Sequence, residues 1–109
     1  MTISELSTAV QYGINTITIV MNNNSWGAEK SYQKDFFGKR YIGADISSPP
    51  FNKVAQLYGA KGFEVNKISE VNEALKAALK CNKPAVINVN VDPKALYSFR
   101  RDSFKYKEK

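Results

Sequence analysis

The sequence predicts an α/β protein with a parallel sheet. Two observations support this class. Apolar runs rich in β-branched residues alternate along the chain with segments of helical periodicity. The inner half of the first such run is also apolar on both faces, as parallel strands are when helices cover both sides of a sheet. Alternation of this kind predicts parallel strands joined by right-handed crossovers.

The first two elements are expected to be a short helix and a strand. Thr2-Ile3-Ser4-Glu5 has the form of a capping box, in which Thr2 and Glu5 satisfy each other's backbone N–H groups. Gly13 supplies the left-handed residue that ends a helix. The β-branched run Ile14–Met21 then predicts a buried strand.

The rest of the chain continues the alternation. Proline in a first turn and glycine after a last turn indicate where helices begin and end. The expected elements are a helical segment at Trp26–Phe36, a helix begun by Ser48-Pro49-Pro50 and ended by Gly59, a strand at Gly62–Val65, a helix at Glu70–Lys80 capped by Ser69 with Val71, Leu75, Ala78 and Leu79 inward, and a strand at Pro84–Val91.

Composition excludes several classes of function. The 109 residues suffice for one domain or a piece of one, and the 43% hydrophobic content fits a globular protein. The absence of histidine excludes Ser-His and Cys-His nucleophiles. A single cysteine, Cys81, fits a structural role and a cytoplasmic location. No apolar run reaches the roughly 18–20 residues of a membrane span, and no secretory signal is evident.

The net charge of +6 leaves a basic binding module open as a third class of function. Five basic and two acidic residues lie in Arg100–Lys109, with aromatic residues among them. Such a mixture is superficially typical of single-strand binding, but a solvated terminal segment is the favoured interpretation, so nucleic acid is not the expected partner. Arg100 and Arg101 remain weak candidates for anion binding.

The run Asn22-Asn23-Asn24-Ser25-Trp26-Gly27 follows the first predicted strand. Ligands of open α/β sheets bind beyond the carboxyl ends of the strands. Amide and backbone oxygens suit a hard cation such as Mg²⁺, which often also binds substrate phosphates. On residue type alone the favoured interpretation is an asparagine-rich turn that ends a strand, and a metal and phosphate site is the alternative.

Met1–Gly27 resembles the second half of the thiamine-diphosphate signature of acetolactate synthase-like enzymes, which begins Gly-Asp-Gly and ends Asn-Asn. The resemblance implies that the chain is the C-terminal part of a Rossmann-like thiamine-diphosphate-binding domain, with a partial parallel sheet. It also implies that Asn23 binds Mg²⁺ through its side chain and Ser25 through its backbone carbonyl. Asn24, Trp26 and Gly27 complete the implied cofactor contacts. The signature's metal-binding Asp and the family's catalytic Glu are expected outside this chain, so no catalytic residue is assigned within it.

A narrower resemblance is to the sulfoacetaldehyde acetyltransferase family. It rests on Trp26-Gly27-Ala28-Glu29-Lys30 with Gln33, Asp35-Phe36 and Arg40, and on the tail Phe99-Arg100-Arg101-Asp102. This likeness implies an oligomeric enzyme, a dimer or tetramer, that converts sulfoacetaldehyde and phosphate to acetyl phosphate and sulfite in taurine degradation. An acetolactate synthase-like enzyme acting on pyruvate is the alternative. The cofactor domain is expected at residues 1–92 and a basic tail at 93–109.

Three further expectations concern the segment after the asparagines. On residue type alone, Trp26 is expected to fill core rather than to contact the cofactor. Glu29 is expected to pair with Lys30 or Lys34. The basic residues of this segment are expected to add positive charge beside the diphosphate; these are Lys30, Lys34, Lys39 and Arg40.

Overall fold

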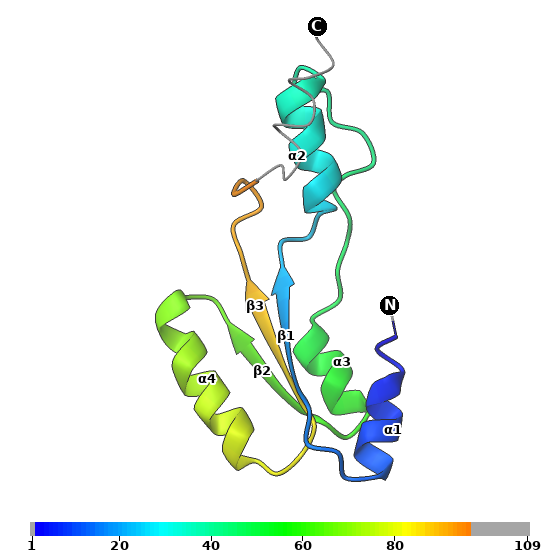
Figure 1. Ribbon diagram of the computed structural model, residues 1–109, viewed down its shortest axis with the longest axis vertical. Helices are drawn as coiled ribbons and strands as arrows, with labels where there is room; N and C mark the ends of the chain where they lie inside the picture. The colour runs from blue at the N-terminus through cyan, green and yellow to red at the C-terminus, as the bar shows by residue number, and fades with distance from the viewer. Residues whose placement is uncertain (1, 97–109) are drawn as a thin grey trace, which may run out of the picture. The chain divides into compact units, whose positions relative to one another are not determined.

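The computed structural model describes residues 2–96 and confirms the predicted α/β class. Within these residues it contains three strands and four helices, and the segment after the asparagines forms one of these helices (Figure 1). The elements are α1 (Glu5–Gln11), β1 (Ile17–Asn22), α2 (Gly27–Phe36), α3 (Phe51–Leu57), β2 (Lys61–Val65), α4 (Ile68–Lys80) and β3 (Ala85–Asn90).

The chain divides into two compact units. The first, which we call the sheet unit, combines Met1–Asn22 with Ser48–Val91 and holds all three strands. The second, which we call the α2 unit, combines Asn23–Ser47 with Asp92–Lys109. The boundary falls between the first and second asparagines of the motif.

The sheet unit contains one parallel sheet with the strand order β1-β3-β2. In its register, Ile87 of β3 lies between Ile19 of β1 and Phe63 of β2. Because β3 is central, its residues Ala85–Val89 are all buried. This burial on both faces explains why the run reads as continuously apolar apart from one asparagine.

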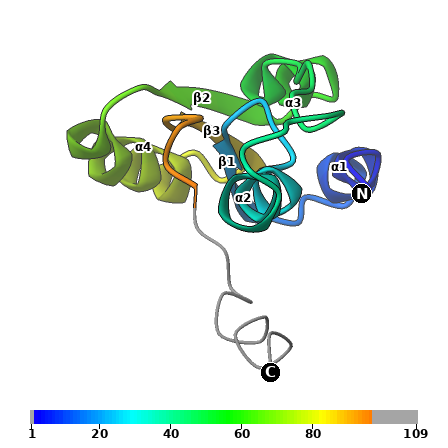
Figure 2. The ribbon, with the colours of Figure 1, turned by 90° about the horizontal axis from the view of Figure 1, so that it is seen from above.

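The two faces of the sheet carry separate apolar cores. Alternate residues of β3, including Ile87, pack with Val65 and with Ala78 of α4. Val86 points to the other face, where it packs with Leu6 of α1 and Ala55 of α3. Figure 2 shows α4 on one side of the strands and α3 on the other. The prediction that Leu79 points inward is wrong, since 64% of its side chain is exposed.

Both predicted side-chain caps are wrong. Helix α1 begins at Glu5 after Ser4, and no side chain caps it, whereas the capping box had placed the cap at Thr2. The Glu5 N–H donates instead to the Thr2 backbone carbonyl, so a backbone turn replaces the capping box. Helix α4 begins at Ile68, which puts Ser69 inside its first turn.

Strand β1 begins three residues later than predicted. Gly13 adopts the expected left-handed conformation, with φ of 62°. The Ile14 N–H then donates to the Ala9 carbonyl at 2.8 Å, which completes the end of α1. Ile14 thus belongs to the helix end, and pairing with β3 starts at Ile17.

The described residues bear on two expectations from composition, the role of Cys81 and the lack of a membrane span. Cys81 packs beside the α4 core cluster, and its Sγ lies 3.0 Å from the Ala78 carbonyl oxygen, which fits a structural role. Among residues 2–96 no helix combines the length and the apolar character needed to cross a bilayer.

Strand β1 forms one edge of the described sheet, and we expect this edge to drive self-association of the isolated chain. Ile19 and Met21 are 44% and 66% exposed. An apolar groove of about 670 Å³ also runs between β1, α1 and Phe51. Leaving a large apolar side chain exposed forgoes roughly 1.5–3 kcal/mol, against a usual total stability of about 5–15 kcal/mol.

Light scattering and a thermal melt on the purified chain test this expectation. Dimers, aggregates or a broad transition are the expected result. A monomer with a sharp transition above about 60 °C would contradict it, because such a protein would be as stable as the best mesophile domains.

Candidate metal and phosphate site

The first asparagine of the motif is part of the sheet, not of the turn that follows. Asn22 is the last residue of β1 and is only 8% exposed. Its Nδ2 donates to Oδ1 of Asn88 at 3.3 Å, and Nδ2 of Asn88 donates to Oδ1 of Asn90 at 3.0 Å. Asn22 is therefore joined to the central strand by side-chain amide hydrogen bonds, which indicates a structural role.

The second asparagine organises the turn that begins the α2 unit. Oδ1 of Asn23 accepts a hydrogen bond from the Ser25 N–H at 3.1 Å, which closes an Asx turn. Asn24 between them has φ of 52°, a left-handed conformation that asparagine tolerates better than most residues. An amide oxygen has two lone pairs, so Oδ1 of Asn23 keeps one lone pair for a cation.

The same turn leaves the Ser25 carbonyl directed outward. Ser25 and Asp45 form an antiparallel bridge in which Trp26 N–H donates to Ala44 and Ile46 N–H donates to Asn24. In a pair of this kind the N–H and C=O of the two central residues point away from each other. The Ser25 carbonyl is thus positioned to act as the backbone ligand that the family resemblance implies.

Helix α2 begins immediately after this turn, and no side chain caps it. The first-turn N–H groups of Gly27, Ala28 and Glu29 have no intrahelical acceptor, so they provide partial positive charge for an anion. A Cβ added at Gly27 would lie 2.8 Å from Nδ2 of Asn23. Glycine at this position leaves the room that the Asn23 amide occupies.

These residues fit a bound Mg²⁺ and diphosphate. The Ser25 hydroxyl is buried and has no hydrogen-bond partner in the described part of the chain. Buried polar groups are usually hydrogen-bonded, so a bound ligand that accepts from this hydroxyl would satisfy it. Asn23 and Ser25 offer oxygens of the type Mg²⁺ prefers. Residues 2–96 hold no cluster of three or more His, Cys, Asp or Glu that could bind a metal ion.

Two expectations about neighbouring side chains are wrong. Trp26 is 57% exposed and does not fill the core. Lys30 pairs with Asp45, and among residues 2–96 Glu29 forms no ion pair with Lys30 or Lys34. The Lys30 ammonium also lies 5.3 Å from the centre of the Tyr41 ring. The bridge to residues 44–46 brings Asp45 beside the first turn of α2, which the sequence did not reveal.

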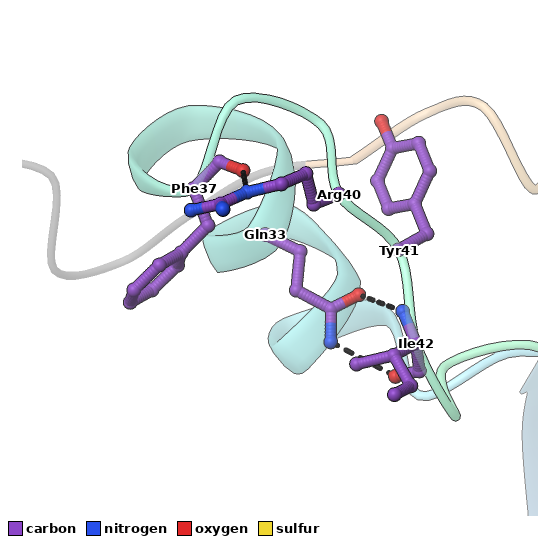
Figure 3. A pocket seen from close by; sticks show the side chains of 5 residues that line it. All are labelled: Gln33, Phe37, Arg40, Tyr41 and Ile42. Carbon is purple, nitrogen blue, oxygen red and sulfur yellow. Dashed lines mark hydrogen bonds between the residues drawn. The ribbon is translucent and has the colours of Figure 1, made fainter.

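The remaining basic residues lie at the other end of α2. Lys34 belongs to its last turn, and Lys39 and Arg40 follow it. At a rise of about 1.5 Å per residue, Lys34 lies about 10 Å along the helix from Gly27, and Lys39 and Arg40 come after the helix ends. Arg40 instead donates from Nε to the Phe37 carbonyl at 3.0 Å and lines a shallow hollow of about 560 Å³ with Gln33, Phe37, Tyr41 and Ile42 (Figure 3).

Comparison with known proteins gives a consistent family. Residues 1–89 match the model of the thiamine pyrophosphate enzyme, C-terminal TPP binding domain. Sulfoacetaldehyde acetyltransferase of Castellaniella defragrans is 35% identical over 107 residues, which cover 94% of this chain and 18% of that protein. Acetolactate synthase large subunit of Haemophilus influenzae is 36% identical over 94 residues, which cover 84% of this chain and 16% of that protein.

A solved structure shows the same fold. The thiamine diphosphate-dependent 4-hydroxybenzoylformate decarboxylase of Rhodococcus jostii RHA1 superposes with a TM-score of 0.71 at 30% identity. The match covers 80% of this chain and 16% of the decarboxylase. The chain thus spans less than a fifth of the length of each of these relatives.

Proposed function

Because the chain belongs to the thiamine pyrophosphate enzymes, as their C-terminal cofactor-binding domain, we propose that Asn23 and Ser25 help to hold the Mg²⁺ and diphosphate of thiamine diphosphate. The Asx turn at the uncapped N-terminus of α2 is the observation that carries this proposal. Asn23 supplies the amide oxygen and Ser25 supplies the backbone carbonyl. Asn24, Trp26 and Gly27 make up the remaining predicted contacts with the cofactor.

The α2 unit binds and orients rather than transferring protons. The first-turn N–H groups of α2 and the buried Ser25 hydroxyl provide donors for phosphate oxygens. When bound, thiamine diphosphate supplies the nucleophilic carbon for addition to a carbonyl group, and the protein places it. No residue of this chain is assigned as a general acid or base.

For the complete enzyme, the proposed reaction converts sulfoacetaldehyde and phosphate to acetyl phosphate and sulfite. The 35% identity to sulfoacetaldehyde acetyltransferase over 94% of the chain supports it, together with the Trp26–Lys30 resemblance. An acetolactate synthase-like reaction of pyruvate is the second candidate, supported by the 36% identity to acetolactate synthase. We further propose that the complete enzyme is a cytoplasmic homo-oligomer. Arg100 and Arg101, the candidates for anion binding, lie outside the described residues.

Sulfite release provides the test of this proposal. The complete enzyme is expected to release sulfite from sulfoacetaldehyde with phosphate, Mg²⁺ and thiamine diphosphate, and to turn over pyruvate poorly. Acetolactate formation from pyruvate without sulfite release would favour the second candidate. If neither activity is found and the protein binds heparin in a salt-dependent way, a basic binding module would be favoured instead.

The 109-residue chain by itself is expected to show no turnover in the same assay. The family resemblance implies an Mg²⁺-binding Asp and a catalytic Glu, and neither role is assigned to a residue of this chain. A rate in the usual enzyme range of about 1–1000 per second would disprove this expectation. The complete enzyme serves as the positive control.

A further inference from the structure

We propose that Gln33 and the Lys30–Asp45 ion pair are positioning residues for the Asn23–Ser25 turn. They act through residues 42–46, which we call the return segment. The inference deepens the proposed function and rests on it for its effect on cofactor binding. Its structural basis lies entirely within the α2 unit.

The return segment contacts the turn through two backbone hydrogen bonds. Trp26 N–H donates to the Ala44 carbonyl at 2.7 Å, and Ile46 N–H donates to the Asn24 carbonyl at 3.1 Å. These bonds lie on either side of Ser25 and fix the direction of its carbonyl. A shift of the return segment would therefore turn the proposed ligand.

Helix α2 anchors the return segment at its first residue. Nε2 of Gln33 donates to the Ile42 carbonyl at 3.0 Å, and Oε1 of Gln33 accepts from the Ile42 N–H at 3.1 Å (Figure 3). The amide thus pairs with both backbone groups of Ile42, as a neighbouring strand residue would. If the Gln33 side chain rotated away, both of its hydrogen bonds to Ile42 would break.

A second anchor lies one turn earlier on the same helix. Lys30 donates to the Asp45 carboxylate, and the Lys30 side chain is only 16% exposed. Residues three apart share one face of a helix, so Lys30 and Gln33 contact Asp45 and Ile42 of the return segment from one surface of α2. Asp45 is also the bridge partner of Ser25, which joins this anchor directly to the turn.

Apolar packing holds the return segment only at its centre. Ala44 is buried, at 3% exposure, but Ile42 and Ile46 are 81% and 40% exposed. Gly43 has φ of 61°, so the segment also contains a flexible, left-handed residue. The polar anchors from α2 therefore decide where the segment lies.

Amide hydrogen exchange of the complete enzyme, read by mass spectrometry on peptides that contain Trp26 and Ile46, tests the structural half. Gln33→Met keeps the length of the side chain but removes both bonds to Ile42. We expect Trp26 and Ile46 amides to exchange about 10-fold faster, the effect of losing one or two net hydrogen bonds. The same substitution at exposed Gln11 on α1 is the matched control and should leave both amides unchanged.

Cofactor titration of the complete enzyme tests the functional half. Gln33→Met is expected to raise the Kd for Mg²⁺–thiamine diphosphate about 10-fold and to leave kcat unchanged at saturating cofactor. Lys30→Asp should do the same, and the double variant Lys30→Asp with Asp45→Lys should restore affinity because it rebuilds the ion pair. A general loss of folding would lower kcat and would not be rescued.

The outcomes separate the inference from the proposed function. Unchanged exchange at Trp26 and Ile46 in Gln33→Met overturns the inference. The inference is also overturned if Gln33→Met speeds exchange but leaves cofactor affinity unchanged, while Asn23→Ala still weakens cofactor binding. If neither Gln33→Met nor Asn23→Ala affects cofactor affinity, the proposed metal site itself is wrong.

Discussion

Gly62→Ala is expected to destabilise the chain by at least about 3 kcal/mol, the upper end of the usual cost of overpacking. A Cβ at this position in β2 would lie 2.0 Å from the backbone oxygen of Asn52 and 2.6 Å from its carbonyl carbon. Because the obstacle is the backbone of α3, no rotamer change can relieve the clash. Helix α3 must therefore move away from the sheet, which opens the core around Ala55 and Val86.

Circular dichroism during urea and thermal unfolding measures this effect. Lys61→Ala, on the exposed neighbouring residue of β2, is the matched control and should stay within about 0.5 kcal/mol of the parent chain. A loss of this size from a total of about 5–15 kcal/mol would leave much of the Gly62→Ala protein unfolded. Equal midpoints for the two variants would show that α3 does not approach β2 so closely.

The regular elements could be predicted because their signals are local. The β-branched run of β3, the glycine after α3 and the periodicity of α4 each act over a few residues. Gly59, for example, adopts the left-handed conformation expected after a helix, with φ of 88°. The caps at Thr2 and Ser69 failed because backbone turns competed with the same side chains, a choice that residue types do not determine. The strand order β1-β3-β2 depends on contacts between segments far apart in the sequence, which local patterns do not specify.

The candidate site was predictable only in part. The resemblance pointed to Asn23 and Ser25, and the structure places both in one turn. The return segment was missed because its position depends on a chain reversal after α2. Gly38 and Lys39 both have positive φ, of 59° and 58°, and this pair turns the chain back along the helix. The glycine was visible in the sequence, but nothing showed that Gln33 would pair with Ile42.

The structure also gives a physical reason for treating the first two asparagines differently. The Asn22 amide is buried in the sheet unit and donates to Asn88. The Asn23 amide lies in the turn and is bonded there by the Ser25 N–H. Substitutions at the two positions should therefore affect different properties of the protein, although the residues are identical and adjacent.

Asn23→Ala in the complete enzyme is expected to weaken Mg²⁺–thiamine diphosphate binding by about 100-fold or more. It removes a proposed metal oxygen, and even outer partners of metal ligands are worth about 10–100-fold. Asn23→Asp should bind nearly normally, because a carboxylate oxygen can both accept the Ser25 N–H and coordinate Mg²⁺. Titration of the cofactor at fixed Mg²⁺ measures both variants.

Asn22→Ala is the matched control, and its effect should appear in stability instead. It removes the donor to Oδ1 of Asn88, whose side chain is buried, and an unsatisfied buried group costs about 1–3 kcal/mol. Cofactor affinity should fall less than about 10-fold, the factor that corresponds to 1.4 kcal/mol. If Asn22→Ala weakens binding as much as Asn23→Ala, the metal ligand is assigned to the wrong asparagine, and the Asx turn at Asn23 serves only to begin α2.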